Sequence, residues 1–318
     1  MNVFNVFHSL SCLVLLFQVA QSALIPICQY DSDRQTQPTT PDSNSESGIP
    51  SLPWAPSSAA TPSVPQQAGS PEIAGTTELI IPYYVYPSEG AWVPLEKLAT
   101  DNPNVSFTVI VNPASGPGAD AVPDQNWRRE IPKLASHSNV VILGYIATRY
   151  GGRPIDQIER DLKTYAEWPT AGNDANLKVH GIFLDEVAGE PDEKKLAYYR
   201  QITATIKGNK GLGPNNRVVL NPGTVPDKAY LDIPDSTVIF ESPHNRWQEA
   251  LKGGLFDPIK NVDKARLASM VTAVPAGTDI RGLVNELRDV SGHVYLTTAA
   301  SYTEYSTSWE EVARILAA

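Results

Sequence analysis

Eight short runs of apolar residues recur along the second part of the chain, and most are separated by patterns typical of amphipathic helices. The runs are rich in Val, Ile and Tyr, which favour buried strands. They span residues 79–85, 106–112, 139–146, 179–186, 217–223, 236–241, 266–274 and 293–298. Strand–helix alternation predicts a parallel sheet covered by helices, and eight repeats in about 240 residues match a (β/α)8 barrel. A doubly wound open sheet is the alternative, but no nucleotide-binding fingerprint accompanies the strands.

Helical periodicity is clearest in four segments of the same region. They span residues 153–168, 192–207, 279–290 and 308–318. The last begins with Ser308 and carries Glu311 three residues later, which predicts a capping box at its start.

The chain has three predicted regions. Residues 1–22 contain the apolar run "LSCLVLLFQVA" followed by small residues, which predicts a cleaved signal peptide, with an uncleaved anchor as the alternative. Residues 23–77 are rich in Ser, Thr and Pro and predict a disordered linker. Residues 78–318 form the predicted single-domain barrel. We therefore expect a secreted protein, extracellular or associated with a cell wall.

Charge and composition exclude several function classes. The formal net charge is −10 and no basic block interrupts it, which argues against nucleic-acid binding. The five histidines show no metal-binding spacing, and no phosphate loop or nucleophile elbow is present. We therefore expect no metal and no cofactor, no membrane contact by the barrel itself, and a monomer.

Polar side chains follow several of the predicted strands. Carboxylates end two of them, Asp185 and Glu186 after "GIFL" and Glu241 after "VIF". Active sites of (β/α)8 barrels lie at the carboxyl ends of the strands. Because strand side chains alternate between faces, Asp185 should point into the barrel mouth and Glu186 outward, unless the strand has already turned.

Carboxylates at a barrel mouth suit two chemistries. A pair can divide the work of glycoside hydrolysis, one donating a proton and the other acting as nucleophile or base. Several carboxylates could also bind calcium or magnesium, although the spacing matches no EF-hand loop. The strand ends also supply candidate substrate-binding side chains: Tyr84, Asn112, Tyr145, Thr148, Tyr150, Asn221 and Tyr295. Asn104 begins the single glycosylation sequon, on the face opposite the predicted site, whereas His180 is expected to pack structurally.

Several blocks together resemble a known family. The segments "IIPYYVYPSEGAWVPL", "FTVIVNPASGPG", "VVILGYIATRYGGRPI", "VHGIFLDE", "VVLNPGTVPDKAY" and "VIFE" are similar to the spherulin-4 family, also called spherulation-specific family 4 or glycoside hydrolase family 135. The resemblance covers residues 78–318 and implies a (β/α)8 barrel. It also implies endo-acting hydrolysis of α-1,4-linked galactosamine-containing polysaccharide, as in secreted fungal hydrolases of galactosaminogalactan. The acidic residues of the family match Asp185, Glu186 and Glu241.

These observations support one main hypothesis and one alternative. In the main hypothesis Asp185 is the nucleophile or charge stabiliser, Glu241 the general acid/base and Glu186 a supporting group, although Glu186 could exchange roles with either. An acidic cleft would also attract a partly deacetylated, cationic glycan. In the alternative, the protein is a cell-wall or spore-associated protein that binds glycan without cutting it.

Overall fold

The computed structural model describes residues 77–318 and shows a closed, all-parallel barrel in which each strand pairs with the next. Strand β1 also pairs with β8, with Glu78 opposite His293, so no sheet edge is left open. The strands are β1 (Glu78–Pro82), β2 (Phe107–Val111), β3 (Val140–Ala147), β4 (Gly181–Asp185), β5 (Arg217–Leu220), β6 (Ser236–Pro243), β7 (Leu267–Thr272) and β8 (His293–Leu296). The predicted (β/α)8 barrel is confirmed, and the open-sheet alternative is wrong.

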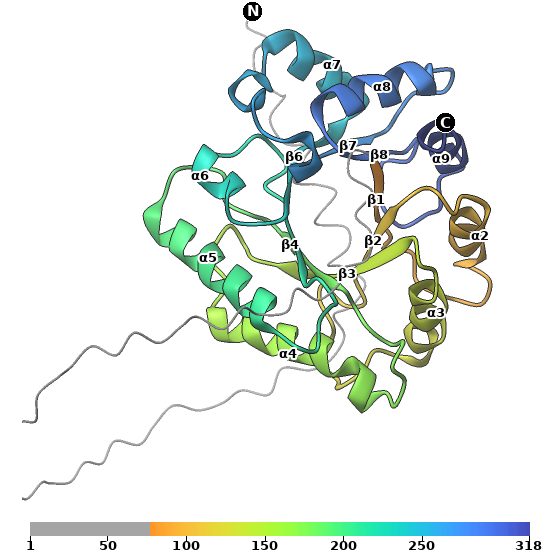
Figure 1. The fold of residues 1–318 in the computed structure, drawn as a ribbon, viewed down its shortest axis with the longest axis vertical. Coiled ribbons are helices and arrows are strands. Elements are labelled where there is room, and N and C mark those ends of the chain that lie inside the picture. The colour runs from red at the N-terminus through yellow and green to blue at the C-terminus, as the bar shows by residue number, and fades with distance from the viewer. Residues whose placement is uncertain (1–76) are drawn as a thin grey trace, which may run out of the picture. The chain divides into compact units, whose positions relative to one another are not determined.

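The helices surround the strands in chain order (Figure 1). They are α2 (Val93–Asp101), α3 (Gln125–Ala135), α4 (Ile155–Ala171), α5 (Glu193–Gly208), α6 (Lys228–Leu231), α7 (His244–Gly253), α8 (Ile280–Val290) and α9 (Ser308–Leu316). Two short 3-10 turns, η1 (Asp257–Ile259) and η2 (Lys264–Arg266), precede β7. The four predicted helices correspond to α4, α5, α8 and α9.

The strands form where the sequence is continuously apolar, because the barrel interior covers one face and the helices cover the other. All five residues of β1 and of β2 are buried. Several strands end earlier than predicted: β1 stops at Pro82 and β5 at Leu220. One more backbone bond follows each of these strand ends, from the Tyr83 N–H to the Ile110 carbonyl oxygen and from the Asn221 N–H to the Leu184 carbonyl oxygen. The chain then forms the loops that carry the site.

The predicted capping box at the start of α9 is wrong. The helix already includes Ser308, and its N-cap is Thr307, which makes no side-chain capping bond. The Ser308 hydroxyl instead lies 2.7 Å from that of Ser306. A true cap has a non-helical backbone from which its side chain can reach the amides of the first turn, and Ser308 is one residue too late for this.

A charged cluster closes the amino-terminal end of the barrel. The Glu78 carboxylate accepts two bonds from the Arg217 guanidinium, at 2.8 and 2.9 Å, and a bond from the Thr108 hydroxyl. His293 Nδ1 lies 3.0 Å from the same carboxylate. Burial acts to raise the pKa of Glu78, but Arg217 and His293 outweigh it and hold the pKa well below its usual value. We call these four residues the barrel floor.

The alternation of side chains along a strand shows which residues lie at the opposite end of the barrel. In β5, Arg217, Val219 and the next residue of the same parity, Asn221, point to the same side. Asn221 therefore stands at the carboxyl-terminal mouth of the barrel. In the loop before β2, Asn104 is exposed at the floor end, as the sequence predicted.

Some predictions concern residues outside the described part of the chain. The signal peptide, the alternative anchor and all of the linker except its last residue, Thr77, fall outside the described residues, so they stay predictions. No helix within residues 77–318 is both long and apolar enough to cross a membrane.

Candidate active site

The mouth of the barrel brings together side chains from six segments. Asp185 is the last residue of β4, and Glu241 lies near the end of β6. Asn221 follows β5 directly, Tyr145 lies in β3, and Tyr84 follows β1. Because the strands are parallel and the barrel is closed, their carboxyl ends meet at one rim. The loop after β8 contributes one more residue, described below.

Asn221 joins the two carboxylates that the sequence singled out. Its Nδ2 donates to Asp185 Oδ1 at 2.8 Å and to Glu241 Oε2 at 2.5 Å. Its Oδ1 accepts the backbone N–H of Gly223 at 3.0 Å, so the amide oxygen is occupied and the NH2 group must face the carboxylates. Both hydrogens of that NH2 group are thus used.

The shared nitrogen limits how far apart the carboxylates can lie. Asp185 Oδ1 and Glu241 Oε2 are at most 5.3 Å apart, the sum of their two distances to Asn221 Nδ2. The pair is therefore close enough to act on the two sides of a single bond.

Each carboxylate also has its own tyrosine. The Tyr145 hydroxyl donates to Asp185 Oδ2 at 2.8 Å. The Tyr302 hydroxyl donates to Glu241 Oε1 at 2.5 Å. All four carboxylate oxygens thus accept a hydrogen bond, and both side chains are held in one orientation before any ligand binds.

Asp185 and Glu241 differ in the causes that shift their pKa values. Burial raises the pKa of Asp185, while the bonds from Tyr145 and Asn221 act in the opposite direction. Burial also raises the pKa of Glu241 and the negative charge of Asp185 raises it further, while the bonds from Tyr302 and Asn221 act in the opposite direction. Two close carboxylates in a dry site do not both ionise easily. Glu241 is therefore better placed to hold a proton while Asp185 is ionised.

Glu186 lies where the strand turns. Its backbone φ is +53°, a left-handed conformation that is unfavourable for a residue with a Cβ. Its carbonyl oxygen accepts the Tyr150 N–H at 2.6 Å and the Thr148 hydroxyl at 2.8 Å, which hold it there. Such a turn ends the alternation of side chains between the two faces of the strand. The prediction that Glu186 points outward depended on that alternation. Burial raises the pKa of Tyr145, and the charges of Asp185 and Glu186 raise it further.

Thr148 supports this turn from beneath. It is fully buried, and its hydroxyl contacts the carbonyl oxygens of Asp185 and Glu186 and, at 3.0 Å, the hydroxyl of Tyr199. Tyr199 Oη also accepts the Ala188 N–H at 3.0 Å. Both residues therefore position the backbone of the carboxylate pair, and Thr148 has no surface available for substrate in this structure.

The remaining predicted residues lie at different depths. Tyr84 packs edge-on against Tyr145 and Tyr302, with ring centroids 5.7 and 5.6 Å away, so it forms a wall of the mouth. Tyr295 is buried behind Tyr302, at 5.6 Å, and supports that ring. Tyr150 is exposed at the rim.

Asn112 and His180 have structural contacts. Asn112 Oδ1 accepts the Gly116 N–H at 3.0 Å and so holds the loop after β2; it makes no hydrogen bond to the carboxylates. His180 Nδ1 accepts the Ile142 N–H at 2.9 Å just before β4, far along the barrel from the mouth. Burial lowers the pKa of His180 to about 4, consistent with the packed histidine that the sequence predicted.

Sequence reasoning missed Tyr302 and Tyr199. Tyr302 lies six residues beyond the end of β8, in the loop segment "SYTEYST", where no periodicity indicates which side chain turns back to the barrel. Tyr199 lies in the middle of α5 and looks like an ordinary core position. The adjacent Tyr198 and Tyr199 offered a weak signal, but nothing in the pattern distinguishes one from the other.

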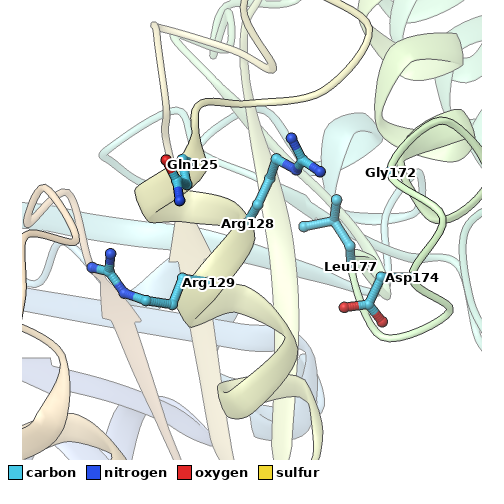
Figure 2. A pocket seen from close by; sticks show the side chains of 6 residues that line it. All are labelled: Gln125, Arg128, Arg129, Gly172, Asp174 and Leu177. Atoms are coloured by element: carbon cyan, nitrogen blue, oxygen red, sulfur yellow. The ribbon is translucent and has the colours of Figure 1, made fainter.

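Two surface hollows lie outside this cluster. One, of about 360 Å³, lies between the start of α3 and the loop after α4 (Figure 2). Arg128 points across it toward Leu177, while Arg129 points away. The other, of about 470 Å³, lies beside α7. Within residues 77–318, no three His, Cys, Asp or Glu side chains are grouped so that they could hold a metal ion.

Comparison with known proteins agrees with the geometry. The family described as Spherulation-specific family 4 matches residues 78–316. Spherulin-4 of Physarum polycephalum is 32% identical over 231 residues, and the match covers 70% of this chain but 64% of that relative, less than two thirds of its length. The crystal structure of Aspergillus clavatus Sph3 in complex with GalNAc is 44% identical, with a TM-score of 0.74 over 76% of this chain and 98% of that chain.

Proposed function

This chain belongs to spherulation-specific family 4, and on that premise we propose that it is a glycoside hydrolase acting on a polysaccharide. The substrate we propose is galactosaminogalactan, cut internally at α-1,4-linked N-acetylgalactosamine or galactosamine units. The observation that carries the proposal is the pair Asp185 and Glu241, joined through one amide at the barrel mouth. The similarity to Sph3, whose structure contains GalNAc, supports the choice of sugar.

The two carboxylates have different roles in the proposed reaction. Glu241, whose pKa is raised by burial and by Asp185, gives its proton to the glycosidic oxygen as the bond to the anomeric carbon breaks. Ionised Asp185 attacks that carbon and forms a glycosyl ester. Glu241, now a carboxylate, then removes a proton from water, and the resulting attack on the anomeric carbon releases Asp185. The leaving sugar departs with the first proton, and water restores the proton on Glu241 and frees the Asp185 carboxylate.

The separation of the carboxylates favours this route. Retaining glycosidases place their carboxyl groups about 5–5.5 Å apart, whereas inverting ones leave about 6.5–9.5 Å for an intervening water. The upper limit of 5.3 Å applies to one oxygen of each carboxyl group, Asp185 Oδ1 and Glu241 Oε2, and it supports the shorter class. We therefore propose retention of the anomeric configuration.

The surrounding residues support the pair in different ways. Tyr145 and Asn221 hold Asp185, and Tyr302 and Asn221 hold Glu241. Burial raises the pKa of Tyr145 and of Tyr302, so both hydroxyls stay protonated and act as hydrogen-bond donors. Glu186, held beside Asp185 by the turn, is proposed to assist binding or proton transfer.

We propose that fewer residues contact the sugar directly than the sequence predicted. Tyr84 and Tyr150 expose surface at or near the mouth, and we propose that both contact the substrate. Thr148 and Tyr295 are proposed to act through the residues they support, and Asn112 through its loop. Secretion, glycosylation at Asn104 and a monomeric state remain part of the proposal.

The alternative function is a wall- or spore-associated protein that binds glycan without cutting it. A binder does not require two carboxylates with raised pKa values linked at one point, since sugars bind equally well to neutral groups. The distinction is testable, because a binder and a hydrolase differ in whether products accumulate.

The test incubates the purified protein with galactosaminogalactan and follows soluble oligosaccharides over time, beside Asp185→Asn. We expect release by the wild type, and release reduced by at least about 10³-fold in the variant, whose glycan binding is retained. Binding without release by either protein would favour the alternative. If both release products equally, Asp185 takes no part in the reaction. Binding that weakens with added salt would further support a cationic, partly deacetylated substrate.

A further inference from the structure

Tyr86 is an aromatic ring left half exposed at the rim of the barrel. Its exposed fraction is 51%, while most large apolar side chains of residues 77–318 are buried. Aromatic rings with polar edges are a common binding surface because they offer a large contact area with few rotatable bonds. An exposed ring at the rim of a proposed polysaccharide site is therefore a candidate sugar contact.

The ring is held rigidly by the start of α3. The Tyr86 hydroxyl donates to Asp124 Oδ2 at 3.2 Å and accepts from Asn126 Nδ2 at 2.7 Å. The ring packs edge-on against Trp127, with centroids 6.3 Å apart and planes at 83°. Asp124 also caps α3 by accepting the Asn126 N–H at 2.8 Å. Helix formation and placement of the ring are thus coupled.

A second set of bonds anchors the neighbouring backbone. Arg129 Nη2 donates to the Pro87 carbonyl oxygen at 2.8 Å, and Arg129 Nη1 donates to Asn126 Oδ1 at 2.8 Å. The segment after β1 is therefore attached to α3 through both side chain and main chain. Since the Tyr86 hydroxyl is already engaged with protein partners, the part left for a ligand is the ring face.

The ring is also close to the carboxylates. Tyr84 packs against Tyr145 and Tyr302, the two tyrosines that bond Asp185 and Glu241. Tyr86 follows Tyr84 by two residues, and two residues of chain span at most about 7 Å. A single polysaccharide chain bound across the mouth can therefore contact both tyrosines.

We propose that Tyr86 is a stacking platform for a sugar unit outside the units that flank the cleaved bond. The proposal rests on the proposed function for its choice of polysaccharide. A galacto-configured pyranose has a continuous C–H face at C3, C4 and C5, which fits a flat ring. That face is remote from the substituent at C2, so the platform should accept acetylated and free-amine units equally.

The experiment compares Tyr86→Ala and Tyr86→Phe with the wild type on an α-1,4-linked N-acetylgalactosamine trisaccharide and octasaccharide. Binding is measured calorimetrically in proteins that also carry Glu241→Gln. Turnover is measured in proteins that keep Glu241. We expect Tyr86→Ala to weaken octasaccharide binding about tenfold, equivalent to about 1.4 kcal/mol, and to leave trisaccharide binding and turnover unchanged. Tyr86→Phe keeps the ring and should bind nearly as the wild type does. Val93→Ala, at a residue 55% exposed on α2, is the matched control and should change neither.

The outcomes separate this inference from the proposed function. If the octasaccharide is bound through Tyr86 but never cleaved, the platform stands and the hydrolase proposal fails. Equal octasaccharide binding by Tyr86→Ala and the wild type, with cleavage intact, overturns the platform alone. If Tyr86→Ala weakens binding of the trisaccharide as much as binding of the octasaccharide, Tyr86 lies at the cleaved bond and the platform proposal is overturned. An absence of binding by every protein would also overturn it. Unchanged thermal midpoints show that the variants are folded.

Discussion

Asn221 is the single residue on which the geometry of the active site depends most. One NH2 group bonds both Asp185 and Glu241, and its orientation is set by a backbone amide rather than by either carboxylate. The residue therefore fixes the distance between the two groups and neutralises part of their repulsion. The sequence predicted Asn221 as a substrate contact; its observed bonds make it first a positioning residue.

We predict that Asn221→Ala lowers kcat by about 10²-fold, because small displacements of reacting groups have effects of that size. The change should affect kcat more than KM, since it releases the carboxylates and leaves the rest of the mouth intact. Steady-state kinetics on galactosaminogalactan measure both. Asn112→Ala removes another strand-end asparagine, one that bonds its own loop rather than the carboxylates, and should lower kcat far less. An equal loss in the two variants would show that the effect is not specific to the pair.

A second residue-scale prediction concerns pH and stability. The pKa of Glu241 is raised by burial and by Asp185, so the folded state holds its proton more tightly than the unfolded state does. The resulting destabilisation is absent below the unfolded pKa, grows as the pH rises toward the folded pKa and is complete above it. Glu241→Gln removes it and should raise the thermal midpoint by about 2–4 °C near neutral pH, the shift expected for 1 kcal/mol in a domain of this size. The gain should disappear at pH values below the usual pKa of a glutamate; a constant gain at all pH values would contradict this explanation.

At the scale of elements, the barrel has a polar group at each end of the same strands. β5 carries Arg217 at the floor and is followed by Asn221 at the mouth, and β1 begins with Glu78 and leads to Tyr84. The barrel floor connects strands that are distant in sequence, because Glu78 belongs to β1, Arg217 to β5 and His293 to β8. The floor stabilises the barrel, whereas the mouth contains the site.

We predict that Glu78→Ala destabilises the protein by about 3–5 kcal/mol, because removing one partner of a buried ion pair leaves the other uncompensated. Arg217 and His293 would both lose their carboxylate. Since the pKa of Glu78 is held low, its stabilisation is present at neutral pH and is lost only as the pH falls through that low value. Chemical denaturation measures the difference. Lys97→Ala, which removes an exposed ion pair with Asp101, is the control and should change stability little.

At the scale of the whole molecule, the sequence was sufficient to predict the architecture. Eight apolar runs separated by helical patterns gave the barrel, because burial on both faces leaves a clear signal in each strand. The strand-end position of Asp185 and Glu241 then followed from the fold. Tyr302 could not be found in this way, because its loop has no repeat that reports side-chain direction. The left-handed turn at Glu186 was equally hidden, since it depends on bonds from Thr148 and Tyr150 in another loop.

The domain boundary is also a prediction at this scale. The family match begins at residue 78, which is the first residue of β1. We predict that a chain beginning at residue 77 retains the thermal midpoint and the kcat of the full chain, since it contains all eight strands and the pairing of β1 with β8 that closes the barrel. Calorimetry and kinetics on both chains test this. A midpoint lowered by several degrees would show that residues before 77 contribute to folding.

Proton NMR of the reducing ends formed in the first seconds of galactosaminogalactan hydrolysis tests whether Asp185 and Glu241 act as nucleophile and acid/base. We expect α-anomers before mutarotation, because Asp185 and Glu241 are held close enough for a glycosyl ester and two successive displacements. We also expect Asp185→Asn to produce no such signal. Initial β-anomers would contradict the assigned roles of the two carboxylates, and α-anomers formed equally by Asp185→Asn would remove Asp185 from the reaction.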